Sequence, residues 1–148
     1  MKKGISILFS IIMLAACATP KIPKEQVGQA KSEEVEGSYV VVDVTLTDGK
    51  VTKIGIDETG ASSFDGEKTG TKKQLGDEYG MKTFSKIDKE WFQQIKALEE
   101  YIVAKGIDTI KVEDQHVTND DLKTSVTIKV DKYLEVSKKA IEDAKTKK

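Results

Sequence analysis

The segment DLKTSVTIKV, residues 121 to 130, places an acid near several hydroxyl side chains. Asp121 stands six residues before Thr127, and Thr124 and Ser125 lie between them. A loop of this composition can present the Thr127 hydroxyl to chemistry. The segment also fits a β-strand, since β-branched side chains favour strands. We interpret it as a strand that leaves Thr127 accessible, with a presenting loop as the alternative; on the strand, one apolar face is formed by Val126, Ile128 and Val130.

Other candidate chemistry is weaker. His116 is the only histidine, and the spacing of the acids around it matches neither an EF-hand loop nor a zinc site. It is therefore predicted to be a solvated loop residue. The glycine-rich segment 58–70 lacks the spacing of a phosphate-binding loop, and no G-x-S-x-G elbow occurs. The chain is accordingly not predicted to be an enzyme, and no metal site is indicated.

The N-terminus predicts export. Residues 1–16 have a basic start, a short apolar run and small residues, which is the order of a secretory signal peptide. The only cysteine, Cys17, follows Leu14-Ala15-Ala16. This pattern resembles the lipobox of bacterial lipoproteins, in which the cysteine is acylated and becomes the first residue of the mature chain. The expected partner is thus membrane lipid through Cys17, and the expected location is the extracytoplasmic face of the cell membrane or envelope.

Composition excludes several classes of site. A chain processed at Cys17 retains no further cysteine, so disulfides, cysteine–zinc sites and thiol nucleophiles are excluded. Every basic side chain is lysine, so the bidentate guanidinium contacts that often bind phosphate are absent. The formal net charge is −1, which gives no indication of nucleic-acid binding.

The remaining sequence predicts a tether followed by one α+β domain. Residues 17–36 are polar and contain two prolines, and they are predicted to be a flexible tether. Residues 37–146 are predicted to fold as one domain. In that domain, a small antiparallel sheet, formed by an N-terminal hairpin and a later strand, is expected to pack against a main amphipathic helix and a C-terminal helix.

Individual elements follow from periodicity. Alternating apolar residues around Asp48-Gly49 predict a hairpin over residues 39–57. Helical spacing predicts the main helix, with Asp88 as its N-cap and Gly106 at its end. A short helix interrupted by Gly76 is expected before it, and a final helix capped by Asp131 after the 122–130 strand. The core stripe of the main helix is predicted to be Trp91, Phe92, Ile95, Leu98 and Ile102.

Three stretches resemble the FMN-binding domains of secreted bacterial electron-transfer proteins, especially a lipoprotein branch. They are the opening GSYVVVDVTLTDGKVTKIGIDE, then LGDEYGMK with KEWFQQIKALEEYIV, and finally DLKTSVTIKV with the last helix. In that family an acid precedes Ser/Thr-Gly-Ala-Thr, whose last threonine a flavin transferase can esterify through the FMN phosphate. The resemblance aligns Asp121 with the acid, Thr124 with the Ser/Thr and Thr127 with the acceptor, while Ser125 and Val126 replace Gly-Ala.

Two functions follow from this resemblance. One is a flavin-based electron carrier in which Asp121, Thr124, Ser125 and Thr127 contact FMN, with a redox protein as its partner. The other is a flavin-free lipoprotein that keeps the fold and binds another ligand or an envelope protein. Glycine permits close backbone approach to a ligand, whereas Ser-Val favours an extended strand. The departure from Gly-Ala therefore favours an unmodified Thr127.

Overall fold

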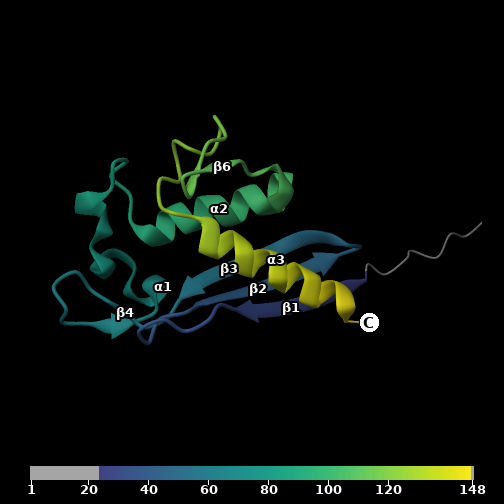
Figure 1. Ribbon diagram of the computed structural model, residues 1–148, viewed down its shortest axis with the longest axis horizontal. Coiled ribbons are helices and arrows are strands. Elements are labelled where there is room, and N and C mark those ends of the chain that lie inside the picture. Colours follow the sequence, from purple (N-terminus) through teal and green to yellow (C-terminus); the bar gives the residue numbers. More distant parts are fainter. Residues whose placement is uncertain (1–23, 148) are drawn as a thin grey trace, which may run out of the picture.

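The computed structural model describes residues 24–147 (Figure 1). The predicted signal peptide, the lipidation site Cys17 and the first part of the predicted tether lie outside this range. The elements, in chain order, are β1 (Glu25–Lys31), β2 (Val40–Thr47), β3 (Lys50–Glu58), β4 (Ala61–Ser62), β5 (Thr69–Gly70), α1 (Lys72–Leu75), the 3₁₀ helices η1 (Gly76–Tyr79) and η2 (Met81–Phe84), α2 (Trp91–Lys105), η3 (Ile107–Thr109), β6 (Val112–Glu113), β7 (His116–Val117) and α3 (Asp131–Thr146).

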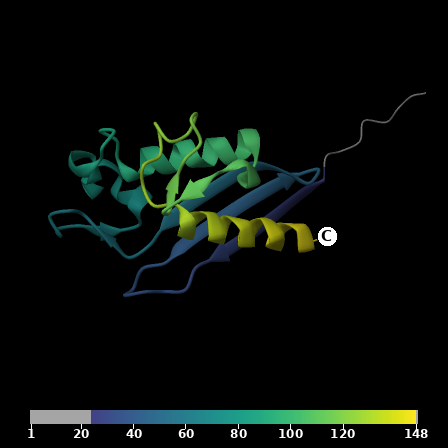
Figure 2. The same ribbon diagram turned by 45° about the horizontal axis from the view of Figure 1, so that its top comes forward.

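The architecture is a three-stranded antiparallel sheet, in the order β1-β2-β3, with two long helices on one of its faces (Figures 1 and 2). Helix α3 packs on β1 and β2, and α2 packs on β3. The predicted α+β class is confirmed. Within the described range, no helix has the length and apolar character needed to cross a bilayer.

The predicted hairpin is confirmed as β2 and β3. Its turn places Asp48 at φ 50° and Gly49 at φ 80°, the left-handed pair that a tight hairpin turn requires. The strand register pairs Val42 with Ile56 and Val44 with Ile54. Period two therefore sends one apolar row of β2 to the core, and its members are all at most 2% exposed: Val40, Val42, Val44 and Leu46.

The predicted tether is wrong for residues 25–31, which form β1 and pair antiparallel with β2. This strand has no large apolar row because α3 lies directly on it. Gly28 is the contact point: a Cβ built there would stand 2.2 Å from the Ala140 carbonyl oxygen and 2.5 Å from the Ala144 nitrogen. Small residues let the helix approach, and their presence removed the period-two signal that identifies a strand.

The main helix is confirmed as α2, with a start that differs from the prediction. Asp88 is exposed and lies before the helix at φ 54°, while Glu90 is the N-cap and forms a capping box with Gln93. Trp91 is 2% exposed, as a core residue should be, and Phe92 is half-buried. The rest of the predicted stripe is fully buried: Ile95, Leu98 and Ile102.

The final helix is confirmed as α3, and the short helix broken at Gly76 is confirmed as α1 followed by η1. Asp131 does not cap α3: Val130 is the N-cap residue, and Asp131 is the first residue of the helix. A carboxylate in this first turn still interacts favourably with the helix dipole. The buried residues of α3 are Tyr133, Leu134, Val136, Ser137, Ala140, Ile141 and Ala144.

The predicted strand over residues 122–130 is wrong. Residues 120–125 form turns, and residues 126–130 continue as a loop into α3. The third strand of the sheet is β1, which precedes the hairpin, and the later strands β6 and β7 form a separate small hairpin. Leu122, Val126 and Val130 are nevertheless all buried. Their spacing of four residues lets a turn, as well as a strand, direct apolar side chains inward.

The contact between Gly28 and α3 predicts a strong effect of one methyl group. Gly28→Ala should lower the free energy of unfolding by about 3 kcal/mol or more, because backbone atoms of α3 must move. The matched control is Gly55→Ala on β3, where an added Cβ meets nothing within 4 Å. The control should change stability by less than about 1 kcal/mol. Urea titration followed by circular dichroism would measure both, and equal effects would contradict the predicted role of Gly28.

Candidate functional site

The 119–126 segment is a short turn held by its own backbone. The amides of Leu122 and Lys123 both donate to the Asn119 carbonyl, at 3.1 and 2.9 Å, and that of Val126 donates to the Leu122 carbonyl at 3.0 Å. Asn119 also anchors the turn through its side chain, which binds the carbonyl of Thr109 at 2.9 Å. The segment is therefore a loop, as in the alternative interpretation of the sequence.

Thr127 is directed at the interior. Its amide and its hydroxyl both donate to the Oε1 atom of Gln94, at 2.8 and 3.2 Å, and the Ile128 amide donates to the same oxygen at 3.2 Å. Gln94 is fully buried on α2, and its Nε2 donates to Ser85 Oγ and to the Lys89 carbonyl. The Thr127 hydroxyl thus donates to a buried amide oxygen that also accepts two backbone N–H groups.

Asp121 faces another partner. It forms an ion pair with Lys105 and accepts a hydrogen bond from Tyr101 at 3.3 Å. The hydrogen bond from Lys105 holds the pKa of the Asp121 carboxyl below its usual value. Tyr101 lies two turns beyond Gln94 on α2, roughly 10 Å along the axis. Asp121 and Thr127 are therefore attached to different parts of the helix.

The four residues aligned with the flavin motif do not form one site. Thr124 is exposed and Ser125 is half-buried, and the backbone amide of Ser125 is bonded within the turn to Leu122. The Thr127 amide and hydroxyl, the natural donors for a phosphate, are both engaged by Gln94. This arrangement does not fit an FMN phosphate site, and no chemistry can be derived from it.

A polar cluster that the sequence analysis did not identify lies at the opposite end of the sheet from the Asp48-Gly49 turn. It joins Glu58 of β3, Lys72 of α1 and Tyr133 of α3. The Glu58 carboxylate accepts from Lys72 Nζ at 2.7 Å and from the Tyr133 hydroxyl at 2.6 Å. Trp91 Nε1 donates to the same hydroxyl at 3.0 Å, and the Lys72 ammonium lies 5.3 Å from the Trp91 ring centroid.

Burial and pairing act against each other in this cluster. Burial disfavours the charged form of Glu58, but hydrogen bonds from Lys72 and Tyr133 outweigh it and hold the Glu58 pKa below its usual value. Burial likewise acts to lower the pKa of Lys72, yet its partners in the cluster raise that pKa. Burial raises the pKa of the Tyr133 hydroxyl, so it stays protonated and can donate to Glu58. The cluster is a satisfied ion pair at neutral pH.

The alternation of inward and outward residues along β3 could have predicted this cluster. Glu58 pairs with Val40, a core residue, so it points to the same face as the apolar row of β2. A charged residue in an inward position implies a buried partner.

A cavity of about 250 Å³ opens beside Tyr133, lined also by Gln115, Lys129, Asp131 and Lys132. It is smaller than the roughly 300–1,000 Å³ of usual ligand pockets.

His116 is exposed, as predicted, but it begins strand β7 and is not in a loop. Its Nδ1 lies 2.7 Å from the Asp114 carbonyl oxygen. Nowhere in residues 24–147 do three or more potential metal ligands form a cluster. The acids near His116 in sequence therefore do not assemble around it.

The surface near the polar cluster exposes two aromatic rings. Phe64, between β4 and β5, is 60% exposed, and Phe84, at the end of η2, is 67% exposed. The rings stack with centroids 4.4 Å apart and an interplanar angle of 15°. We call these two residues the aromatic patch. The sequence analysis did not identify it, because isolated phenylalanines in loops have no periodic pattern.

Comparisons with known proteins give a fold and no function. No protein-family model matches the chain, and no curated protein matches it. The chain is similar to a solution NMR structure of a protein from Clostridium thermocellum, a structural genomics target, with 23% identity and a TM-score of 0.51. The match covers 82% of this chain and 92% of that one. At this identity the likeness shows a shared fold alone.

The Glu58 cluster predicts a pH-dependent stability. Glu58→Gln leaves the Lys72 ammonium, whose side chain is 16% exposed, without its anionic partner, and should cost about 3 kcal/mol at neutral pH. Because the folded-state pKa of Glu58 lies below the ordinary glutamate pKa of 4.5, this stabilisation is present above pH 4.5 and is lost as acid protonates the folded form. The difference between wild type and variant should therefore shrink below pH 4.5.

Denaturant titrations from neutral to acidic pH would measure this difference. Glu135→Gln is the control, since its exposed pair with Lys139 contributes little. A difference between wild type and Glu58→Gln that stays constant with pH would show that ionisation of Glu58 does not stabilise the fold.

Proposed function

We propose that the protein is a lipid-anchored extracytoplasmic lipoprotein that works without flavin and binds another envelope protein through the aromatic patch. Acylation at Cys17 supplies the anchor in this proposal. The observation that carries it is the pair of stacked, exposed rings of Phe64 and Phe84. Exposed aromatic groups on a rigid scaffold are typical centres of protein interfaces.

The backbone under the patch is held by hydrogen bonds and a close glycine contact. Glu90, which is 3% exposed, accepts the amides of Met81 and Lys82 at 2.9 and 3.0 Å. It thereby fixes the start of η2, which carries Phe84. On the other side, Gly80 at φ 77° lies against Phe64, where an added Cβ would be 3.1 Å from the Phe64 Cβ. A surface ordered before binding loses less conformational entropy when a partner docks.

The rim of the patch has the polarity of an interface edge. An ion pair of Lys68 and Glu78, both about half exposed, stands beside the loops that carry the rings. An apolar centre with charged surroundings is the usual anatomy of a specific interface. The partner surface should accordingly offer an apolar or aromatic side chain to the patch.

A flavin-based electron carrier is the competing function, because the sequence resembles FMN-binding domains. The engagement of Thr127 by Gln94 supports the flavin-free function. Covalent attachment would require the Thr127 hydroxyl to leave Gln94. The Gln94 side-chain oxygen would then keep its hydrogen bonds from the backbone N–H groups of Thr127 and Ile128 only if this part of the backbone did not move.

We predict that co-expression with a flavin transferase leaves the mass of the mature protein unchanged. Visible absorbance of the purified protein should also show no flavin. The positive control is Ser125→Gly with Val126→Ala, which restores the family motif at those two positions. An FMN-sized mass increase on wild type that Thr127→Val abolishes would overturn the flavin-free proposal. Thr127→Val alone should cost only about 1 kcal/mol of stability, since one hydrogen bond is removed.

The aromatic patch is tested by site-specific photo-crosslinking in cells. A photoreactive residue at the exposed position Thr83 should form an adduct with another protein, and Phe64→Ser with Phe84→Ser should abolish it. A photoreactive residue at exposed Glu135 on α3 is the position control and should form no adduct. An adduct at Thr83 that persists without both rings, or no adduct there, would contradict binding through the patch.

A further inference from the structure

The chain enters the domain at the end of the sheet that holds the β2–β3 turn. The Lys24 amide donates to the Asp48 carboxylate at 3.1 Å, and the Asp48 amide donates to the Lys24 carbonyl at 3.0 Å. Helix α3 ends at the same place, since Gln26 Nε2 donates to the carbonyls of Ala144 and Lys147. Figures 1 and 2 show the β1 start and the C-terminus at this end. We call it the turn end.

Strand β1 leaves few residues between Cys17 and the fold. Only residues 18–23 lie between Cys17 and Lys24. Even a fully extended chain of this length spans at most roughly 25 Å. Strand β3, with nine residues, is itself roughly 30 Å long. An anchor at Cys17 therefore keeps the turn end within one domain length of the membrane, and the aromatic patch lies at the other end of the sheet.

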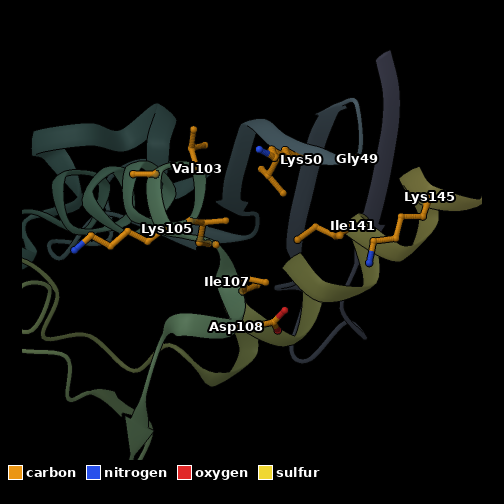
Figure 3. Close-up of a pocket in the computed structure, with 12 residues that line it drawn as sticks. Gly49, Lys50, Val103, Lys105, Ile107, Asp108, Ile141 and Lys145 are labelled. Atoms are coloured by element: carbon orange, nitrogen blue, oxygen red, sulfur yellow. The ribbon is translucent and has the colours of Figure 1, made fainter. Parts of the chain in front are cut away.

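The turn end contains the pocket drawn in Figure 3, with a volume of about 370 Å³. It lies between the β2–β3 turn, the end of α2, η3 and α3. The lining of the pocket is mixed, with branched apolar side chains beside three lysines and one aspartate. The apolar side chains that line it are Val51, Ile102, Val103, Ile107 and Ile141.

Lys50 and Lys145 supply positive charge from two sides, from β3 and from α3 (Figure 3). Lys50 has no acidic partner within 4.0 Å among the described residues, and the partner of Lys145 is the exposed Glu142. Lys105 points away from the pocket in Figure 3, toward its partner Asp121. Asp108 is the one acid in the lining.

We infer that the turn end binds phospholipid of the membrane that holds the anchor. In this inference, Lys50 and Lys145 contact the phosphate of an anionic headgroup, and the apolar side chains of the pocket meet the adjoining glycerol and acyl carbons. Long lysine side chains suit this boundary, since their stems lie on apolar surface while the ammonium reaches the headgroups. Each lysine near an anionic membrane surface strengthens binding to that surface, and the contributions of two lysines add. A short link to the anchor also raises the effective lipid concentration at the pocket.

This inference rests on the proposed anchoring through Cys17, and the experiment separates the two. The mature protein is reconstituted in vesicles of phosphatidylglycerol and phosphatidylcholine, and flotation reports anchoring. Because the chain has one cysteine, which acylation blocks, a fluorophore can be placed at Thr52→Cys near the turn or at Thr83→Cys near the aromatic patch. Nitroxide on the lipid headgroups should quench the Thr52 probe severalfold more than the Thr83 probe.

Charge variants identify the contact. Lys50→Gln with Lys145→Gln should remove most of the difference between the probes, whereas Lys86→Gln, exposed before α2, should leave it unchanged. Equal quenching at both probes of a floating protein, or a difference unaffected by the double variant, would overturn the inference. If the fluorophore at position 52 is shielded from solvent but is not quenched by the lipid nitroxide, another protein or a second copy of this chain covers the turn end. That result would also overturn the inference.

An unanchored form tests the pocket when anchoring itself fails. Wild-type protein that does not float would refute the anchor but not the lipid site. Cys17→Ser protein, labelled at Thr52→Cys, is then titrated with the same vesicles. Its affinity should fall roughly thirtyfold in the Lys50→Gln, Lys145→Gln variant, from the contribution of two lysines at an anionic surface. Equal affinities, or no binding to anionic vesicles at millimolar lipid, would reject the lipid site.

Discussion

One half-buried carboxylate, Glu58, joins the parts of the chain that the sheet alone cannot connect. It ends β3 on the inward face and binds α1 through Lys72 and α3 through Tyr133. Tyr133 in turn receives the indole N–H of Trp91, so the start of α2 belongs to the same cluster. A charge taken out of water is tolerated only when it is paired and hydrogen-bonded. The satisfied cluster therefore defines how both long helices meet the end of the sheet.

The helices also protect the two edges of the sheet. On β3, the Ile56 amide donates to Glu99 of α2 at 2.6 Å, and on β1, the Gln29 amide donates to Asp143 of α3 at 2.9 Å. Free edge amides invite pairing with another strand. A carboxylate from the covering helix occupies one such amide on each edge, so the helices that bury the inner face also limit edge-to-edge association.

Periodic features of the sequence could be predicted, and contacts that depend on tertiary packing could not. The β2–β3 hairpin and the core stripe of α2 follow from local pattern, because bulky apolar residues repeat at period two or 3.6. Strand β1 escaped notice because Gly28 replaces a bulky residue where α3 touches the sheet. The β-branched residues of the 122–130 segment predict a strand, but the amides of Thr127 and Ile128 donate to Gln94 in place of a neighbouring strand.

The same limit applies to the candidate site. Residue types in DLKTSVT suggested a presented hydroxyl, yet the group that decides its role, Gln94, lies 33 residues earlier on another element. No pattern around Thr127 reveals that partner. A buried glutamine has two donors and two acceptor lone pairs to satisfy, and a loop with amides and a hydroxyl meets that demand. The amide and hydroxyl of Thr127 and the amide of Ile128 all donate to the one side-chain oxygen of Gln94, so packing of the loop on α2 engages the threonine side chain.

The two ends of the sheet carry different surfaces. Loops concentrate at the Glu58 end of the sheet. In proteins generally, loops held by a scaffold of helices and strands often carry the residues that bind a partner. Glu90 and Gln94 are buried at the start of α2, and they hold the segment that carries Phe84 through Met81, Lys82 and Ser85. The turn end has a short connection, between β2 and β3, and holds the first and last described residues, Lys24 and Lys147. If Cys17 is acylated as proposed, the anchor reaches the domain at the turn end and leaves the loop-rich end unobstructed. The direction of β1 in the sheet, set by its register with β2, would then determine which surface of the anchored domain meets a partner.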